Sequence, residues 1–374
     1  MAALYHTRIR LSITLVNLRI ALLAGYSRLD KSLSPTLTIH RILAHKFVFS
    51  DLTYIIHLSL SLFWLSIIPS SPSPIFIPYK LLIPLLYTTT LLLPLTNQFV
   101  VPATPVFSWS LTYFSNQYIP DTHRPPVFIS LLPTLETVLY GTNISDILTR
   151  YTHPFLDILA WIPYGVIHFI LPFLIAFFLF LFRARGALRM CATTFGYLNL
   201  ISVVIQLGIP TSAPWYEVIY GLTPASYTML GSPGGLARID ELFHSNWYTV
   251  GFTHSPLPFG AFPSLHAGNA TLAALFVTHF FPSYTEMVWA YCVVLYWATM
   301  YLTHHYLVDV VGGGCIATVF FFMFLPNELR GDAALEYPPG YTPGTDTAGF
   351  GPSSSSPSFS SILNRAGAGR SKYV

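Results

Sequence analysis

Long apolar stretches separated by polar connections are the strongest pattern in the chain. A transmembrane helix needs about 20 mostly apolar residues. The stretches that approach this length are 50–68, 78–102, 158–182, 188–209, 264–281, 286–303 and 307–326. Prolines interrupt some of them, but helices packed in a membrane bundle tolerate such kinks. The pattern predicts an all-α, polytopic membrane bundle with six to eight transmembrane helices.

Two long connections run from about 103 to 157 and from about 209 to 264, and the second is too polar to cross a membrane. The second connection is rich in aromatic residues, among them Trp215, Tyr216 and Trp247. Tryptophan and tyrosine favour the membrane–water interface. We therefore expect residues 209–264 to fold as a cap on one membrane face.

Composition agrees with a membrane protein. Charged residues make up 9% of the chain, whereas a soluble domain carries about a quarter. The net charge of +3 is too small to indicate a nucleic-acid partner. The three cysteines, Cys191, Cys292 and Cys315, lie in apolar runs without metal-ligand spacing. We expect no metal ion and no cofactor.

The two ends of the chain differ from its apolar middle. Residues 1–49 are basic and predict a cytosolic N-terminal region. Residues 50–326 form the predicted transmembrane catalytic domain. Residues 327–374 are dominated by Gly, Pro, Ser and Thr, a composition with too little apolar surface to fold on its own. We expect these residues to be a disordered cytosolic tail.

Basic residues predict the orientation in the membrane. They concentrate before residue 49, in the turn Arg183–Arg189 and in the tail, so all three should be cytosolic and the cap lumenal. Three crossings before Arg183 would instead place that turn opposite the N-terminus. Either one early segment does not span, or residues 70–104 or 103–157 hide an extra crossing.

The first candidate for catalysis is the pair His305 and Asp309. The two residues are four apart, so on a helix their side chains lie on one face. Asp309 can then accept the Nδ1 proton of His305 and leave Nε2 as a nucleophile. An acid inside an apolar membrane helix is a functional candidate, although the pair also fits a helix cap beside an interfacial histidine.

The second candidate is His266. Ser264 suits an N-cap, which places His266 in the first turn of the following helix. Backbone N–H groups at a helix start favour a phosphate oxyanion, and a histidine there can act as general acid and base. One helical hairpin, 264–281 and 286–303, separates His266 from His305. Both histidines therefore reach one face, where they suit in-line phosphoryl transfer.

The motifs around these residues resemble a known superfamily. Pro-Ser-Leu-His266 followed by His305-x-x-x-Asp309 is similar to the second and third motifs of the type 2 phosphatidic acid phosphatase superfamily. More narrowly, Gly231-Ser-Pro-Gly-Gly-Leu-Ala-Arg-Ile-Asp240 and Phe262-Pro-Ser-Leu-His-Ala-Gly268 resemble the fungal inositol phosphorylceramide synthases. The resemblance covers about residues 155–326 and implies the superfamily's helical fold.

The resemblance also implies roles for the three candidates. His305 would form a phosphohistidine, Asp309 would orient His305, and His266 would protonate the departing diacylglycerol and activate the ceramide hydroxyl. The superfamily's Lys-x6-Arg-Pro motif is absent, and its Ser-Arg pair before the nucleophile is replaced by Ala298 and Thr299.

Other residues must therefore meet the phosphate charge. We expect Arg238, which lies among glycines in the cap, to be the cation that binds phosphate, with Ser264 and helix N–H groups supplying the remaining hydrogen bonds. A structural role for Arg238, paired with Asp240 or Glu241, is the alternative.

The resemblance implies transfer of phosphoinositol from phosphatidylinositol to ceramide, with release of diacylglycerol. It also implies a Golgi membrane location, a lumenal active site and a small regulatory membrane subunit as partner. The alternative is a lipid phosphate phosphatase with water as acceptor, which the missing Lys and Arg motifs disfavour. A transporter or scaffold with incidental histidines would tolerate His266→Ala and His305→Ala.

Overall fold

The computed structural model describes residues 2–69 and 76–341, and within them the regular structure is helical with no strand. The all-α prediction is confirmed for these residues. The α-helices are α1 (Ala2–Ser27), α2 (Pro35–Ala44), α3 (Leu52–Ile67), α4 (Phe76–Leu92), α5 (Pro94–Val100), α6 (Thr104–Ser115), α7 (Leu131–Tyr140), α8 (Ile144–Thr149), α9 (Pro154–Trp161), α10 (His168–Phe182), α11 (Arg185–Gly208), α12 (Pro214–Tyr220), α13 (Ala237–Leu242), α14 (Trp247–Thr253), α15 (Leu265–Phe280), α16 (Thr285–Tyr301) and α17 (Leu307–Phe324).

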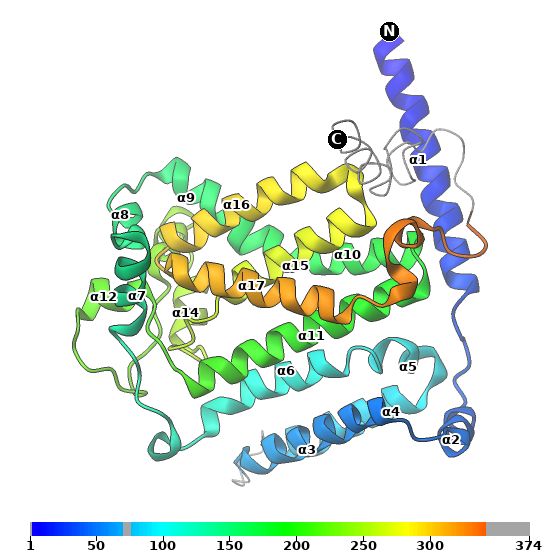
Figure 1. Ribbon diagram of the computed structural model, residues 1–374, viewed down its shortest axis with the longest axis horizontal. Helices are drawn as coiled ribbons and strands as arrows, with labels where there is room; N and C mark the ends of the chain where they lie inside the picture. The colour runs from blue at the N-terminus through cyan, green and yellow to red at the C-terminus, as the bar shows by residue number, and fades with distance from the viewer. Residues whose placement is uncertain (1, 70–75, 342–374) are drawn as a thin grey trace, which may run out of the picture.

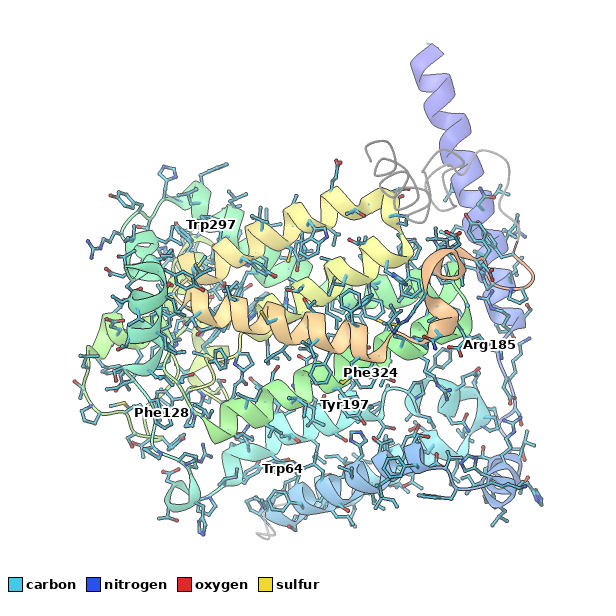
Figure 2. The ribbon with its side chains drawn as sticks, in the orientation of Figure 1. Trp64, Phe128, Arg185, Tyr197, Trp297 and Phe324 are labelled. Carbon is cyan, nitrogen blue, oxygen red and sulfur yellow. The ribbon has the colours of Figure 1, made fainter. Side chains whose placement is uncertain are left out.

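The long helices form one bundle in which α15 packs against α10, α11, α16 and α17 (Figure 1). Apolar side chains such as Phe276 and Phe321 fill its core, and Tyr197 of α11 stacks on Phe324 of α17 (Figure 2). Helices α15 and α17 approach closely at Gly313, where a Cβ atom would collide with the carbonyl oxygen of Ser264. This close approach brings the starts of the two helices together.

Several helices are long and apolar enough to cross a membrane, which makes the protein a multi-pass membrane protein. Among the described residues, those of at least 18 residues are Phe49–Ile67, Pro154–Phe182, Arg185–Gly208 and Leu307–Phe324. The predicted segments 264–281 and 286–303 form α15 and α16, which have 16 and 17 residues. The predicted segment 78–102 is divided by Pro94, at which α5 begins. The number of crossings stays a prediction.

Helix α6 bears on the predicted conflict over orientation. This helix lies within the connection 103–157, packs along α11, and returns the chain to the end of the bundle that carries the cap (Figure 1). The turn at Arg183 then lies at the same end as the N-terminal region. Contacts support this placement, because Arg28 donates a hydrogen bond to the carbonyl of Phe180 at 2.7 Å and Arg185 donates one to the carbonyl of Arg28. The basic segments among the described residues therefore share one end.

The predicted cap is folded. Helices α12, α13 and α14 come from residues 209–264, and α7 and α8 of the other connection join them at the same end of the bundle (Figure 1). Trp215, Tyr216 and Phe259 of the cap form an apolar cluster with Leu132 of α7 and Tyr306. The cap is thus anchored beside the start of α17.

The segment that follows α17 differs from the sequence prediction. Residues 327–341, assigned above to a disordered tail, pack on the domain, and Leu329, Ala334 and Tyr341 are buried. Tyr341 contacts the ring of Phe182 at 5.4 Å between centroids. Apolar side chains spaced among the glycines and prolines supply this packing. The rest of the predicted tail, 342–374, lies outside the described residues.

Candidate active site

His305 lies in a turn and not on a helix, which corrects the helical spacing argument. Helix α16 ends at Tyr301 and α17 begins at Leu307, and Thr303 takes a left-handed conformation (φ 62°) where the chain reverses. Asp309 lies in the first turn of α17, and its Oδ2 accepts the Tyr306 N–H at 2.8 Å. The turn still brings His305 Nδ1 to 3.6 Å from Asp309 Oδ2.

The nearest acceptor for His305 is a backbone carbonyl. Nδ1 lies 3.1 Å from the Ala261 oxygen, within hydrogen-bond distance, whereas 3.6 Å to Asp309 is beyond it. A carbonyl oxygen only accepts, so Nδ1 carries the proton and Nε2 of the neutral ring has an available lone pair. Asp309 is fully buried and lies close to His305 without a hydrogen bond to its ring. The His305 tautomer protonated at Nδ1 is the one that the sequence predicts, but the Ala261 carbonyl sets it and not Asp309.

Ser264 begins α15, as the sequence predicts. Its Oγ accepts the Ala267 N–H at 3.3 Å, and the side chain is buried. Its backbone N–H donates to the Asp309 carbonyl at 3.1 Å, which ties the starts of α15 and α17 together. Ser264 does not line the cavity described below. Ser264, which the sequence predicts to bind phosphate, instead caps α15.

His266 is held by aromatic rings. Its ring lies against Tyr164 at 4.2 Å and against His168 at 4.6 Å between centroids. Tyr164 also stacks on His304 at 5.4 Å, and His304 stacks on Phe252 at 4.6 Å. The rings form a continuous column beside α15.

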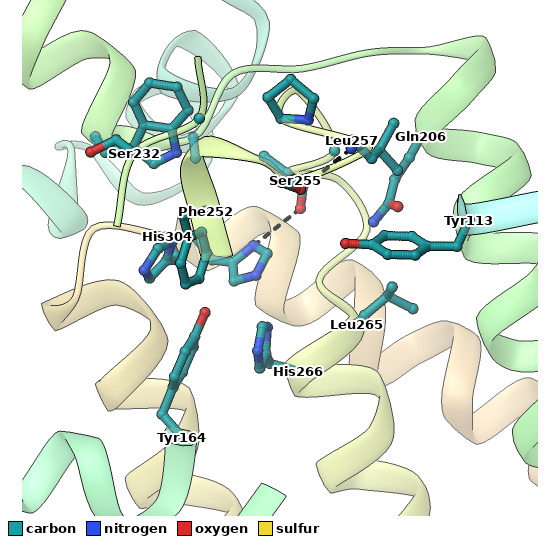
Figure 3. A pocket seen from close by; sticks show the side chains of 17 residues that line it. Tyr113, Tyr164, Gln206, Ser232, Phe252, Ser255, Leu257, Leu265, His266 and His304 are labelled. Carbon is teal, nitrogen blue, oxygen red and sulfur yellow. Dashed lines mark hydrogen bonds between the residues drawn. The ribbon is translucent and has the colours of Figure 1, made fainter. Parts of the chain in front are cut away.

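A cavity of about 160 Å³ lies between the bundle and the cap, and both His266 and His305 line it (Figure 3). The centroids of the two rings are 5.6 Å apart, so both rings border the same part of the cavity. Asp309 lies behind His305 and does not line the cavity. The three residues chosen from the sequence therefore meet at one site.

Arg238 does not line the cavity. Its guanidinium pairs with Asp157 of α9, with Nε 2.8 Å and Nη2 2.7 Å from Oδ1. The same carboxylate oxygen accepts the Tyr301 hydroxyl at 2.9 Å. Asp240, one of the partners considered for Arg238, instead accepts hydrogen bonds from Thr249 and its neighbours. Arg238 therefore joins the cap to α9 and α16 through Asp157.

Glu136 of α7 is a part of the site that the sequence reading missed. It is fully buried, and its Oε1 accepts the Leu307 N–H at the start of α17 at 3.2 Å. Burial, with a smaller effect from the charge of Asp309, raises the pKa of Glu136 to about 7. Ser145 of α8 donates a hydrogen bond to the His305 carbonyl at 3.0 Å. Helices α7 and α8 thus support the segment between α16 and α17 that carries His305.

His304 is a neutral part of the cavity wall. Its Nε2 lies 3.1 Å from the Pro233 carbonyl. Burial, together with the neighbouring His305, lowers the pKa of His304 to about 3. Because the segment is a turn, His304 lines the same cavity.

The family description of the PAP2 superfamily matches residues 132–323, which include both histidines of the cavity and the aspartate behind them, so the chain belongs to this superfamily. The chain is 48% identical over 298 residues to the inositol phosphorylceramide synthase catalytic subunit of Schizosaccharomyces pombe, covering 80% of this chain and 70% of that one. It is 44% identical to the Saccharomyces cerevisiae catalytic subunit of the same name, covering 78% and 72%. The chain belongs to the inositol phosphorylceramide synthase family.

A more distant relative has a related name. The chain is 25% identical over 253 residues to the phosphoinositol dihydroceramide synthase of Bacteroides thetaiotaomicron, covering 63% of this chain and 80% of that one. No solved structure matches the chain.

Proposed function

We propose that this protein transfers phosphoinositol from phosphatidylinositol to ceramide, with inositol phosphorylceramide and diacylglycerol as products. The observation that carries the proposal is the cavity in which the rings of His266 and His305 lie 5.6 Å apart, with Asp309 buried behind His305. The names of the relatives supply the substrate class.

In the first step, Nε2 of His305 attacks the phosphorus atom of phosphatidylinositol. The bond between phosphorus and the diacylglycerol oxygen breaks, and the protonated His266 ring gives its proton to that oxygen. Nδ1 keeps its proton because it faces the Ala261 carbonyl. The phosphohistidine ring is therefore positively charged, and the Asp309 carboxylate 3.6 Å away stabilises it.

In the second step, neutral His266 takes the proton of the primary hydroxyl of ceramide. The hydroxyl oxygen attacks phosphorus and the bond to His305 Nε2 breaks, which restores both histidines. Aromatic and aliphatic side chains such as Phe252, Leu257 and Leu265 line the cavity. An apolar wall of this kind favours a lipid hydroxyl over water as the acceptor.

We assign structural roles to Arg238 and Ser264, in place of the phosphate binding that the sequence predicts. The pairing of Arg238 with Asp157 and the helix cap made by Ser264 support the walls of the site. Neither side chain lines the cavity, so neither is proposed as a direct phosphate ligand.

The cellular setting also belongs to the proposal. We place the protein in the Golgi membrane with the cap in the lumen, because Arg28 and Arg185 lie together at the opposite end. We propose a small regulatory membrane subunit as its partner. Two relatives are named catalytic subunits, which supports a second component.

The proposal is tested with membranes that contain the protein, fluorescent ceramide and phosphatidylinositol. Fluorescent inositol phosphorylceramide should form, His305→Ala should abolish it, and His266→Ala should lower it by about 10²- to 10⁴-fold. Phosphatidic acid supplied in parallel tests the phosphatase alternative. Release of phosphate without any sphingolipid product would favour the phosphatase, and formation of neither by folded protein would overturn both.

A further inference from the structure

The hydroxyl group of Tyr164 is buried at the cavity without a protein partner. Tyr164 lines the cavity, is 3% exposed, and its hydroxyl has no hydrogen-bond partner among the described residues. Buried hydroxyls are normally satisfied because an unmade hydrogen bond costs free energy. Tyr301 and Tyr306 nearby follow this rule, with hydroxyls bonded to Asp157 and Glu217. Other buried side-chain atoms also lack a partner, but among the described residues that line the cavity only Tyr164 has such an atom, and this position points to a ligand.

An irregular turn places Tyr164 at this position. Residues Ile162–Ile167 form a π-helical turn between α9 and α10, and such turns occur frequently at functional sites. Behind it, Trp161 donates a hydrogen bond to the Tyr248 hydroxyl at 2.6 Å. Gly165 fits only because it lacks a side chain, since a Cβ would lie 2.7 Å from the Tyr248 oxygen. The turn is therefore held firmly from the cap side.

The surroundings of Tyr164 are suited to a phosphodiester. In Figure 3 the Tyr164 oxygen points toward the space between His304 and His266. Among the described residues that line the cavity there is no lysine or arginine, and Arg238 is engaged by Asp157. Apart from the His266 proton that the first step uses, a singly charged phosphodiester in such a site depends on neutral hydrogen-bond donors, and a tyrosine hydroxyl is one.

We propose that Tyr164 binds the phosphoryl group of the lipid substrate. Its hydroxyl donates a hydrogen bond to a non-bridging oxygen of the phosphodiester, while its ring holds His266 by stacking. This inference rests on the proposed function and adds a residue to it. Negative charge on the non-bridging oxygens grows as phosphorus is attacked, so the bond strengthens in the transition state and affects kcat as well as KM.

The test is the variant Tyr164→Phe, which keeps the ring and removes the hydroxyl. Its kcat/KM for phosphatidylinositol should fall by about 10- to 100-fold, the range for a hydrogen bond to a charged group. Its melting temperature should be unchanged or higher, because the lost hydroxyl had no protein partner. The matched control is Tyr296→Phe in α16, whose hydroxyl bonds Thr271 away from the cavity, and its kcat/KM should stay near that of the wild type.

Each outcome bears on a separate claim. If wild-type protein makes inositol phosphorylceramide and Tyr164→Phe stays within about twofold of it, the role of Tyr164 is wrong and the function stands. A clear fall in the melting temperature of Tyr164→Phe would show a structural partner for the hydroxyl and also overturn the inference. If folded wild-type protein makes no product, the proposed function itself fails.

Discussion

His305 and His266 line one cavity, but the protein holds the two rings by different means. His305 is fixed by polar contacts, with Ala261 at its Nδ1, Asp309 behind it and Ser145 on its carbonyl. His266 is held by stacking on Tyr164 and His168, and no hydrogen bond to its ring is recorded among the described residues. The proposed roles need this difference. His305, as the nucleophile, needs one fixed tautomer, whereas His266, which gives and then takes a proton, needs a ring nitrogen without a protein hydrogen bond.

The largest expected effects distinguish the two histidines. His305→Ala should abolish transfer with any phosphoinositol donor, because no phosphohistidine can form. His266→Ala should lose about 10²- to 10⁴-fold with phosphatidylinositol, the range for general acid catalysis. A nitrophenyl phosphoinositol donor has a leaving group that needs no acid. With this donor, the His266→Ala variant should again transfer phosphoinositol to His305. Equal losses in both variants with this donor would contradict the assignment of roles.

The next effect concerns Asp309. In enzymes where the carboxylate alone fixes the histidine tautomer, its amide variant loses about 10⁴-fold. Here Ala261 already holds the Nδ1 proton, so Asp309→Asn should lose about 10- to 100-fold, because only charge stabilisation is removed. Steady-state turnover of purified protein measures this. Near-normal turnover would remove Asp309 from the site, and a 10⁴-fold loss would show that Ala261 does not set the tautomer.

Glu136 should make stability depend on pH. Its folded-state pKa of about 7 lies above the ordinary value of 4.5, so the folded state binds more protons than the unfolded state between these values. The wild type should therefore lose stability as pH rises from about 4.5 to 7, by roughly 3 kcal/mol.

Glu136→Gln, which mimics the protonated acid, should lack this loss. Melting temperatures of the two proteins should agree at pH 5, and the variant should be the more stable at pH 8. Parallel curves for both proteins across this range would contradict the raised pKa of Glu136.

The smallest expected effect is that of Ser145→Ala. This variant removes one hydrogen bond to the His305 carbonyl, a loss of about 1 kcal/mol, and should lower kcat only a few-fold while KM stays unchanged. Thr149→Ala in the same helix, whose half-buried hydroxyl bonds the Asp146 carbonyl away from His305, is the control. An equal effect from both variants would show that α8 acts only on stability.

Features set by local sequence were predicted well. The helical fold follows from apolar runs, and the Ser264 cap follows from residue type at a helix start. Features set by distant contacts were not. The pairing of Arg238 with Asp157 joins residues far apart in the chain, and no periodicity reveals it.

Local irregularity hid the remaining parts of the site. The turn at Thr303 takes His305 off a helix, and the π-helical turn at Ile162–Ile167 aims Tyr164 at His266. The apolar pattern of the sequence predicts ordinary helix for both of these turns. Glu136 lies in a connection whose course depends on the packing of the cap, so its burial could not be inferred from the sequence.

The central claim is that His305 carries the phosphoinositol group between the two lipids. Purified protein is mixed with phosphatidylinositol labelled in its phosphate, without ceramide, and quenched in base, which preserves phosphohistidine. The account predicts label on His305, none on His305→Ala, and transfer of the label into inositol phosphorylceramide when ceramide is added. Formation of the sphingolipid product by wild-type protein that never carries label on His305 would contradict it.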